Sequence, residues 1–213
     1  MDPIAEKILM FWFGTTDVSA EMGKNDEWFK STDAFDNALT EQFTDIQAKA
    51  ARGELDHLTE TAEECLALII ALDQFSRNVF RNSPKAFDAD PKARDIARLA
   101  MGRNYHEQYS SWPKVFCYLP FEHSEILEDH DFIEPYYMAL EGAEFEHSKQ
   151  MTLDHSEAIR RFGRYPHRNA VMGRENTPEE EEYLKDPPLW GKTKAEAEEI
   201  MRQKAEREAA ERS

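Results

Sequence analysis

The motifs of several common functional classes are missing from this sequence. The chain has only two cysteines in 213 residues, Cys65 and Cys117, and both stand among apolar neighbours. It has no Cys-x-x-Cys pair and no glycine-rich phosphate loop, which excludes the usual zinc-finger and nucleotide-loop sites. We expect two reduced, buried thiols, as in cytoplasmic proteins. A catalytic thiol is the alternative, but neither cysteine has a basic neighbour that would stabilise a thiolate.

Long apolar runs and excess positive charge are also absent. No stretch approaches the roughly 18 apolar residues that a membrane span requires. The start of the chain lacks the basic residues and the long apolar core of a signal peptide. With 43 acidic residues against 26 basic ones, the formal net charge is −17. This balance argues against nucleic acid and against an anionic membrane surface as partners. The two reduced cysteines lead us to expect a cytoplasmic protein.

Strand signals are nearly absent, because no Asn-Gly or Asp-Gly turn separates two alternating apolar runs. Helical periodicity recurs along the chain instead. The sequence therefore predicts an all-α protein, with one domain over residues 1–190 and a charged, helical or frayed tail over residues 191–213. Two of the predicted helices begin at Thr59 or Thr61 and at Thr177. The others cover residues 3–11, 25–52, 91–102, 115–127, 133–147 and 152–163.

The helix that begins near Thr61 changes character along its length. Its residues 65–72 form a run of eight apolar side chains, which predicts a helix that is buried on all sides. Asp73, Arg77 and Arg81 follow at a spacing of four, so on a continuing helix they share one face. Polar groups at the end of a buried helix must be satisfied within the protein or by a ligand.

One pattern, Phe-x-Arg-x-x-x-Arg-Asn, occurs twice, at residues 75–82 and 162–169. Each copy places two arginines four residues apart, without an acidic residue, near the predicted end of a helix. Because Arg is a fixed five-donor cation suited to carboxylate or phosphate, two copies brought together predict an anion site. The alternative is structural: each Arg gains from the helix dipole or pairs with a buried carboxylate such as Asp73, Glu122 or Glu125.

Histidines in or near these motifs are the candidates for proton transfer. His123, His155 and His167 have side chains that titrate near neutrality. Three acid-His-Ser tripeptides suggest a metal site as an alternative, but their spacing does not match His-Glu-x-x-His or the Glu-x-x-His of di-iron bundles. We expect neither a metal nor a cofactor. Ser124 and Ser156 lack the glycine context of a nucleophile elbow.

Four phrases of the sequence, at residues 9–14, 72–81, 118–125 and 161–169, resemble one bacterial family. They are similar to the family catalogued as domain of unknown function 924. The resemblance implies a tetratricopeptide-like array of antiparallel helix pairs, and it implies no established activity. The charged positions that match the motifs of the family are Asp73, Arg77, Arg81, Glu122, His123, Glu125, Arg161, Arg164, His167 and Arg168.

Two functions compete for this site, and the fold class does not choose between them. The leading hypothesis is a site for a small carboxylate or phosphate metabolite, in which paired arginines bind the anion and a histidine handles protons. The alternative is a tetratricopeptide-like scaffold that holds a peptide carboxylate or an acidic partner. Whether the protein is an enzyme stays open. The candidate ligand-binding residues are Asp73, Arg77, Arg81, Glu122, Glu125, Arg161, Arg164, Arg168 and Asn169.

Overall fold

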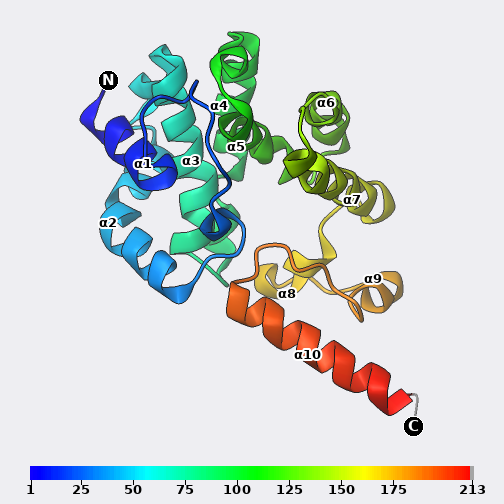
Figure 1. Ribbon diagram of the computed structural model, residues 1–213. Helices are drawn as coiled ribbons and strands as arrows, with labels where there is room; N and C mark the ends of the chain where they lie inside the picture. The colour runs from blue at the N-terminus through cyan, green and yellow to red at the C-terminus, as the bar shows by residue number, and fades with distance from the viewer. Residues whose placement is uncertain (212–213) are drawn as a thin grey trace.

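The computed structural model describes residues 1–211, and it has no strand in that range (Figure 1). The prediction of an all-α protein is therefore confirmed, while the tetratricopeptide-like arrangement stays an expectation. The helices are α1 (Pro3–Phe13), α2 (Asp33–Arg52), α3 (Ala62–Val79), α4 (Asp90–Gly102), α5 (Ser111–Glu122), α6 (Leu127–Met138), α7 (Glu146–Phe162), α8 (Asn169–Met172), α9 (Pro178–Tyr183) and α10 (Lys194–Glu211).

Helix α3 is the centre of the fold. Its residues 65–72 are completely buried, as the apolar run predicts. Helices α1, α2, α4 and α5 pack around it (Figure 1). Each large aliphatic side chain buried in this way stabilises the fold by roughly 1.5 to 3 kcal/mol. The polar end of α3, from Asp73 onward, therefore continues a helix that is held in place by the core.

Helix α2 begins later than the predicted range 25–52. Its N-cap is Thr32, whose Oγ1 accepts a hydrogen bond from the backbone N–H of Phe35. The preceding residues form a separate segment with one 3-10 turn. Trp28 lies in this segment, where it is buried and donates from Nε1 to the carbonyl oxygen of Trp12 at 2.8 Å. Trp28 and Phe35 thus share one core without sharing one helix.

The chain after α5 forms two helices whose limits also differ from the prediction. The acidic stretch 129–131 lies inside α6, because Asp129 is buried and accepts a hydrogen bond from Arg98. The break comes later, at Gly142, whose φ of 116° is readily adopted only by glycine. The predicted helix 133–147 is therefore divided between α6 and α7.

The C-terminal segment extends away from the packed helices. Helix α9 opens with the predicted capping box, formed by Thr177 and Glu180. Residues 184–193 contain no helix, and α10 then runs outward (Figure 1). Lys204 of α10 forms an ion pair with Asp186 at 2.6 Å. In the described part of the chain, no helix is long and apolar enough to cross a membrane.

Candidate functional site

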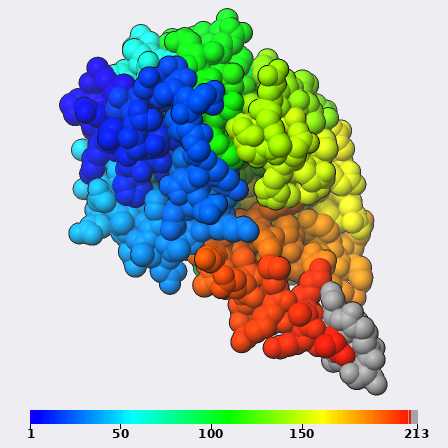
Figure 2. Space-filling model, in the orientation of Figure 1, coloured from blue at the N-terminus to red at the C-terminus, as the bar shows by residue number. Residues whose placement is uncertain are grey.

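A cavity of about 870 Å³ opens between the N-terminal and C-terminal parts of the fold. Its walls come from residues 24–31 before α2, from α3, α5 and α7, and from residues 186–192 before α10. The surfaces of the blue, yellow-green and orange segments meet on the face shown in Figure 2. Because ligand pockets measure about 300 to 1,000 Å³, this cavity has the size for a small organic molecule.

One face of α3 forms the polar side of the cavity. Three of its side chains, Gln74, Arg77 and Asn78, line the cavity at the i, i+3, i+4 spacing of a single helical face. Arg81, in the turn that follows α3, lines the cavity as well. Three carboxylates pair with the two arginines but do not line the cavity: Asp36, Asp73 and Asp90. The guanidinium groups therefore stand between their carboxylate partners and the open space.

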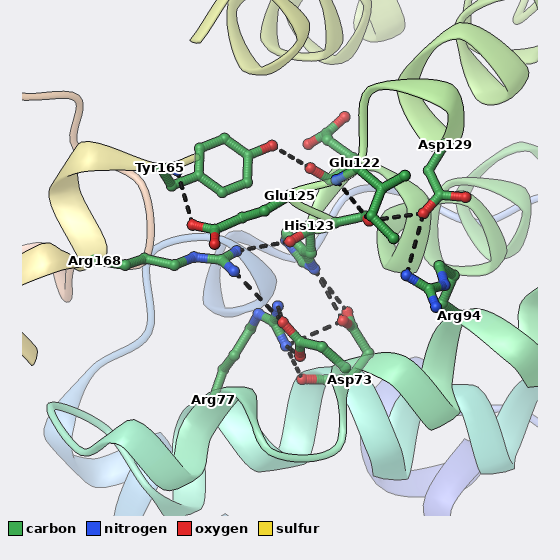
Figure 3. Close-up of polar contacts among 12 residues, drawn as sticks. Asp73, Arg77, Arg94, Glu122, His123, Glu125, Asp129, Tyr165 and Arg168 are labelled. Atoms are coloured by element: carbon green, nitrogen blue, oxygen red, sulfur yellow. Dashed lines mark hydrogen bonds and ion pairs between the residues drawn. The ribbon is translucent and has the colours of Figure 1, made fainter. Parts of the chain in front are cut away.

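Arg77 is held by two carboxylates. Its Nη1 lies 3.0 Å from Asp73 Oδ1 and 2.8 Å from Asp90 Oδ1, and its Nη2 lies 3.0 Å from Asp90 Oδ2. Arg168, from the second copy of the motif, approaches the same Asp90 carboxylate with Nη1 at 3.5 Å. Its Nη2 donates to the carbonyl oxygen of His123 at 3.0 Å (Figure 3). The fold thus joins one arginine of each copy through a shared acid.

His123 and Asp73 form an oriented pair, in which Nδ1 lies 2.9 Å from Oδ1 and 3.1 Å from Oδ2 (Figure 3). Burial would raise the pKa of Asp73, but Arg77 and His123 outweigh it and hold that pKa below its ordinary value. Burial, assisted by Arg77, lowers the pKa of His123. An ionised carboxylate accepts the proton on Nδ1, so the neutral ring keeps its lone pair on Nε2.

The free nitrogen of His123 is available to a ligand. Within residues 1–211, no side chain or backbone group pairs with Nε2. The His123 side chain lines both this cavity and a smaller one of about 180 Å³, which it shares with Asp90 and Arg168. An imidazole that is oriented by a carboxylate and exposes a lone pair to a cavity can act as a general base.

Glu122 is a buried carboxyl next to His123 in sequence, and its side chain lines the cavity. Its Oε2 accepts a hydrogen bond from Thr152 Oγ1 at 2.6 Å, and its carbonyl oxygen accepts one from the Tyr165 hydroxyl (Figure 3). Burial raises the pKa of Glu122 to about 7, although the hydrogen bond from Thr152 opposes the rise. This carboxyl can therefore donate or accept a proton near neutral pH.

Trp190 packs against the other two candidate histidines. Its ring stacks on that of His155 at a centroid distance of 3.7 Å and meets that of His167 edge-on at 5.3 Å. His155 lines the cavity and donates from Nδ1 to the Met151 carbonyl at 2.7 Å, whereas His167 does not line the cavity. Burial lowers the pKa of both histidines, that of His167 to about 3. Both rings are therefore neutral near pH 7.

Most of the second arginine copy supports the C-terminal helices. Arg164 makes a bidentate contact with Glu180 at 2.6 and 2.7 Å, and Asn169 Nδ2 lies 3.3 Å from Glu180 Oε2. Arg161 reaches the edge of the cavity but pairs with the exposed Glu179 at 2.7 Å. These contacts fix α9 against the end of α7.

Two further candidates are also engaged in pairs. Glu125 pairs with Arg174 at 2.7 Å and accepts the backbone N–H of Tyr165 at 2.8 Å. Arg81 lines the cavity, and its Nε donates to Asp36 at 2.6 Å. Of the residues predicted from sequence, four lie together in the wall of the cavity and are here called its floor: Arg77, Glu122, His123 and His155. Asp73 and Arg168 stand behind this floor, where Asp73 pairs with Arg77 and Arg168 approaches Asp90, and neither lines the cavity.

Sequence reasoning missed several residues of this site. Asp90 stands in an ordinary helix start, Phe29 lies in a range predicted as helix, and Trp190 marks the predicted domain boundary. None of the three carries a local signal of its role. Gln74 and Asn78 did carry one, because their spacing places them on one helical face with Arg77.

The side chains of the floor can form hydrogen bonds and transfer protons. In residues 1–211, no group of three or more His, Cys, Asp or Glu side chains is placed to hold a metal ion. The floor instead combines a guanidinium, an oriented imidazole and a carboxyl that titrates near neutrality. This combination can bind an anionic group and exchange a proton with it.

Comparison with known proteins identifies the family. Residues 8–188 match the family described as a bacterial protein of unknown function, DUF924. A solved structure, described as that of the protein of unknown function ATU0120 from Agrobacterium tumefaciens, is 38% identical with a TM-score of 0.75. The similarity covers 85% of this chain and 96% of that chain. No curated protein matches the chain. Because the family match spans most of the sequence and includes Arg77, Glu122 and His123 of the floor, the protein is a member of the bacterial DUF924 family.

Proposed function

We propose that this protein binds a small organic anion in the cavity, with Arg77 holding the anionic group and His123 exchanging a proton with the ligand. The observation that carries the proposal is the polar end of α3 and the turn after it, where Arg77 and Arg81 line the cavity and their carboxylate partners do not. Because α3 is the buried centre of the fold, its polar end is preorganised, and a ligand does not have to order it.

The distribution of charge supports an anion over a cation. The buried cluster is balanced, since Asp73 and Asp90 offset Arg77 and Arg168. A ligand in the cavity nevertheless meets the guanidinium first. Apart from Glu122, the acidic side chains of the lining are exposed or half-exposed. Solvent screens those outer charges more than the floor, so the floor dominates the binding of a charged head group.

Proton exchange at His123 follows from the same arrangement. An anion bound at Arg77 stabilises the protonated form of a nearby imidazole, because an opposite charge favours the charged form. Asp73 holds Nδ1 and supports the resulting imidazolium. Binding of an anion is therefore expected to draw a proton onto Nε2.

Ligand-induced stabilisation tests the binding site. A ligand that binds only the folded protein raises Tm, so we would measure thermal unfolding with small carboxylates, phosphorylated metabolites, and peptides with free or amidated C-termini. An anion is expected to raise the Tm of the natural protein. The Arg77→Lys variant keeps the charge but loses the bidentate geometry, and it is expected to lose the shift.

Arg164→Lys is the matched control for this experiment. Arg164 makes a similar bidentate contact, with Glu180, but does not line the cavity. The control is expected to keep the ligand-induced shift. Equal loss of the shift in both variants would contradict the assignment to Arg77. A response confined to peptides with free C-termini would favour the scaffold function instead.

Calorimetry in buffers of different ionisation enthalpy tests the proton exchange. The natural protein is expected to take up a proton on binding an anion, and His123→Gln is expected to bind without this uptake. Glu122→Gln distinguishes Glu122 from His123 as the group that takes up the proton, because this variant should keep the proton uptake. If uptake disappears in Glu122→Gln and persists in His123→Gln, the proton goes to Glu122 and not to His123.

A further inference from the structure

We infer that the ligand of this cavity is an amphiphilic acid, whose single anionic head lies on the polar face of α3 and whose apolar body lies along one face of α5. The inference rests on the proposed function and adds the chemical class of the ligand. Three apolar side chains of α5, here called the apolar track, carry it: Trp112, Val115 and Leu119.

The apolar track leads directly to the titratable floor. Trp112, Val115 and Leu119 line the cavity, and Glu122 follows them on the same face at the i, i+3, i+7, i+10 spacing. Ten helical residues extend roughly 15 Å, at 1.5 Å each. The three side chains of the track are at most 5% exposed, so they form the closed back of the cavity, and the face ends where Glu122 and His123 can contact a head group.

Phe29 adds apolar surface next to the track. It is 37% exposed, and among the exposed large apolar side chains in the described part of the chain it is the one that lines the cavity. Its ring stacks on Phe116 at 5.8 Å with an interplanar angle of 12°, and it contacts Trp112 at 6.0 Å. These contacts fix the ring against the core while one side stays open. A ligand body that covers this surface removes it from water, which favours binding.

The volume of the cavity exceeds what a head group alone requires. A carboxylate is only a few atoms in size, and one water molecule occupies about 30 Å³, against about 870 Å³ for the cavity. Much of the remaining wall is apolar, including Met151, Phe162 and Leu189 from α7 and the C-terminal segment. A highly hydroxylated anion would leave polar groups without partners against these walls. An apolar body avoids that cost.

A series of straight-chain monocarboxylates tests the ligand class. We would titrate the full-length protein with acetate, butanoate, hexanoate and octanoate by isothermal calorimetry. Affinity is expected to rise roughly fourfold with each methylene that reaches the apolar track, the factor equivalent to about 0.8 kcal/mol. Octyl phosphate compares the two anionic heads on the same body. Octylamine, which has a cationic head, is not expected to bind.

Two variants locate the body of the ligand. Phe29→Ser is expected to weaken octanoate binding and to leave acetate binding unchanged, because acetate occupies only the head site. Met10→Ser is its matched control, since Met10 is 48% exposed and does not line the cavity. Leu119→Phe fills space in the apolar track, so the longest acid that still binds is expected to have a shorter chain than in the natural protein.

Each outcome of the series decides one of the two proposals. Equal affinity for acetate and octanoate would overturn the apolar body and leave the anion site in place. Equal affinity for octanoate and octylamine would overturn the anionic head, and the proposed function with it. A third outcome is that affinity rises with chain length in the natural protein and rises equally in Phe29→Ser and Leu119→Phe. That result would place the apolar body of the ligand away from α5 and overturn its assignment to the apolar track.

Discussion

Glu122 is a carboxyl whose surroundings favour its neutral form. Its folded pKa is about 7, against an ordinary value of 4.5. Because the folded state holds the proton more tightly, its contribution to stability is complete below pH 4.5 and is lost as the pH rises to about 7. The loss corresponds to roughly 3 kcal/mol. Glu122→Gln is expected to remove this pH dependence, as measured by urea unfolding between pH 4.5 and 8.

The control for Glu122 is a glutamate without such surroundings. Glu128 is exposed at the start of α6, so Glu128→Gln should leave the pH dependence of the natural protein unchanged. A pH profile of Glu122→Gln that matches that of Glu128→Gln would show that Glu122 is ionised in the folded protein at neutral pH.

Arg77 and Arg161 provide a matched comparison of a buried and an exposed ion pair. Arg77→Leu leaves the buried Asp73 without its guanidinium and removes the bidentate partner of Asp90. We expect it to lower the free energy of unfolding by roughly 3 to 5 kcal/mol. Arg161→Leu breaks a surface pair with Glu179 and is expected to cost at most about 1 kcal/mol. Similar small losses in urea denaturation would show that Asp73 and Asp90 find other partners.

At the scale of single residues, sequence predicts what a helix alone determines. The shared face of Asp73 and Arg77 follows from their spacing, and the two are 3.0 Å apart. The meeting of Arg77 with Arg168 at Asp90 depends on how three separate elements pack. No local pattern encodes that contact, so the sequence could place Arg164 in the site as readily as Arg168.

The non-helical segment of residues 184–193 is held by a few specific contacts. Trp190 stacks on His155, and the carbonyl oxygen of Gly191 accepts a hydrogen bond from Arg81 at 2.9 Å. Trp190→Ala removes the larger anchor, so we expect more frequent local opening and faster tryptic cleavage after Lys192. Gel or mass-spectrometric time courses measure the rate.

Two controls make the proteolysis specific to this segment. Trp190→Phe keeps an aromatic ring and should be cleaved at an intermediate rate. Cleavage after Arg202, which pairs with Glu199 of its own helix α10, should differ little between the variants. Unchanged cleavage after Lys192 in Trp190→Ala would show that the hydrogen bond to Gly191 anchors the segment by itself.

At the scale of elements, the sequence predicts a helix correctly where its pattern comes from that helix alone, and wrongly where the pattern reflects contacts with another element. The apolar run 65–72 lies on one helix, and it predicts the buried centre of the fold correctly. Two helix limits were predicted wrongly, the start of α2 near Trp28 and the helix boundary near Asp129. Both residues form hydrogen bonds with another element, Trp28 with Trp12 and Asp129 with Arg98. Periodicity and polarity are local measures, and they cannot separate a helical face from a tertiary contact.

For the whole molecule, buried neutral histidines are expected to set the acid limit of stability. Burial lowers the pKa values of His130, His155 and His167, the last from 6.5 to about 3. As the pH falls, these histidines take up protons in the unfolded chain before they do so in the folded protein. Their contribution to the free energy of unfolding is therefore complete above pH 6.5 and is lost at lower pH. Glu122 opposes this trend only between about pH 4.5 and 7. We expect the Tm to fall between about pH 6 and 4 in calorimetry.

His167→Asn tests the origin of this acid sensitivity, because it removes one buried titrating group. The variant should show a smaller fall in Tm with decreasing pH, whatever its Tm at pH 7. His147 is exposed on α7, and His147→Asn should keep the slope of the natural protein. Identical slopes in all three proteins would assign the acid sensitivity to other groups.

The position of Trp190 has a consequence for comparisons among relatives. The matched region ends at residue 188, so the floor of the cavity belongs to the part shared with the family and the Trp190 wall lies just beyond it. On the proposed function, relatives that share Arg77 and His123 are expected to bind the same kind of head group. Contacts made at Trp190 lie outside the matched residues, so this wall is where we would first compare ligand preference between members.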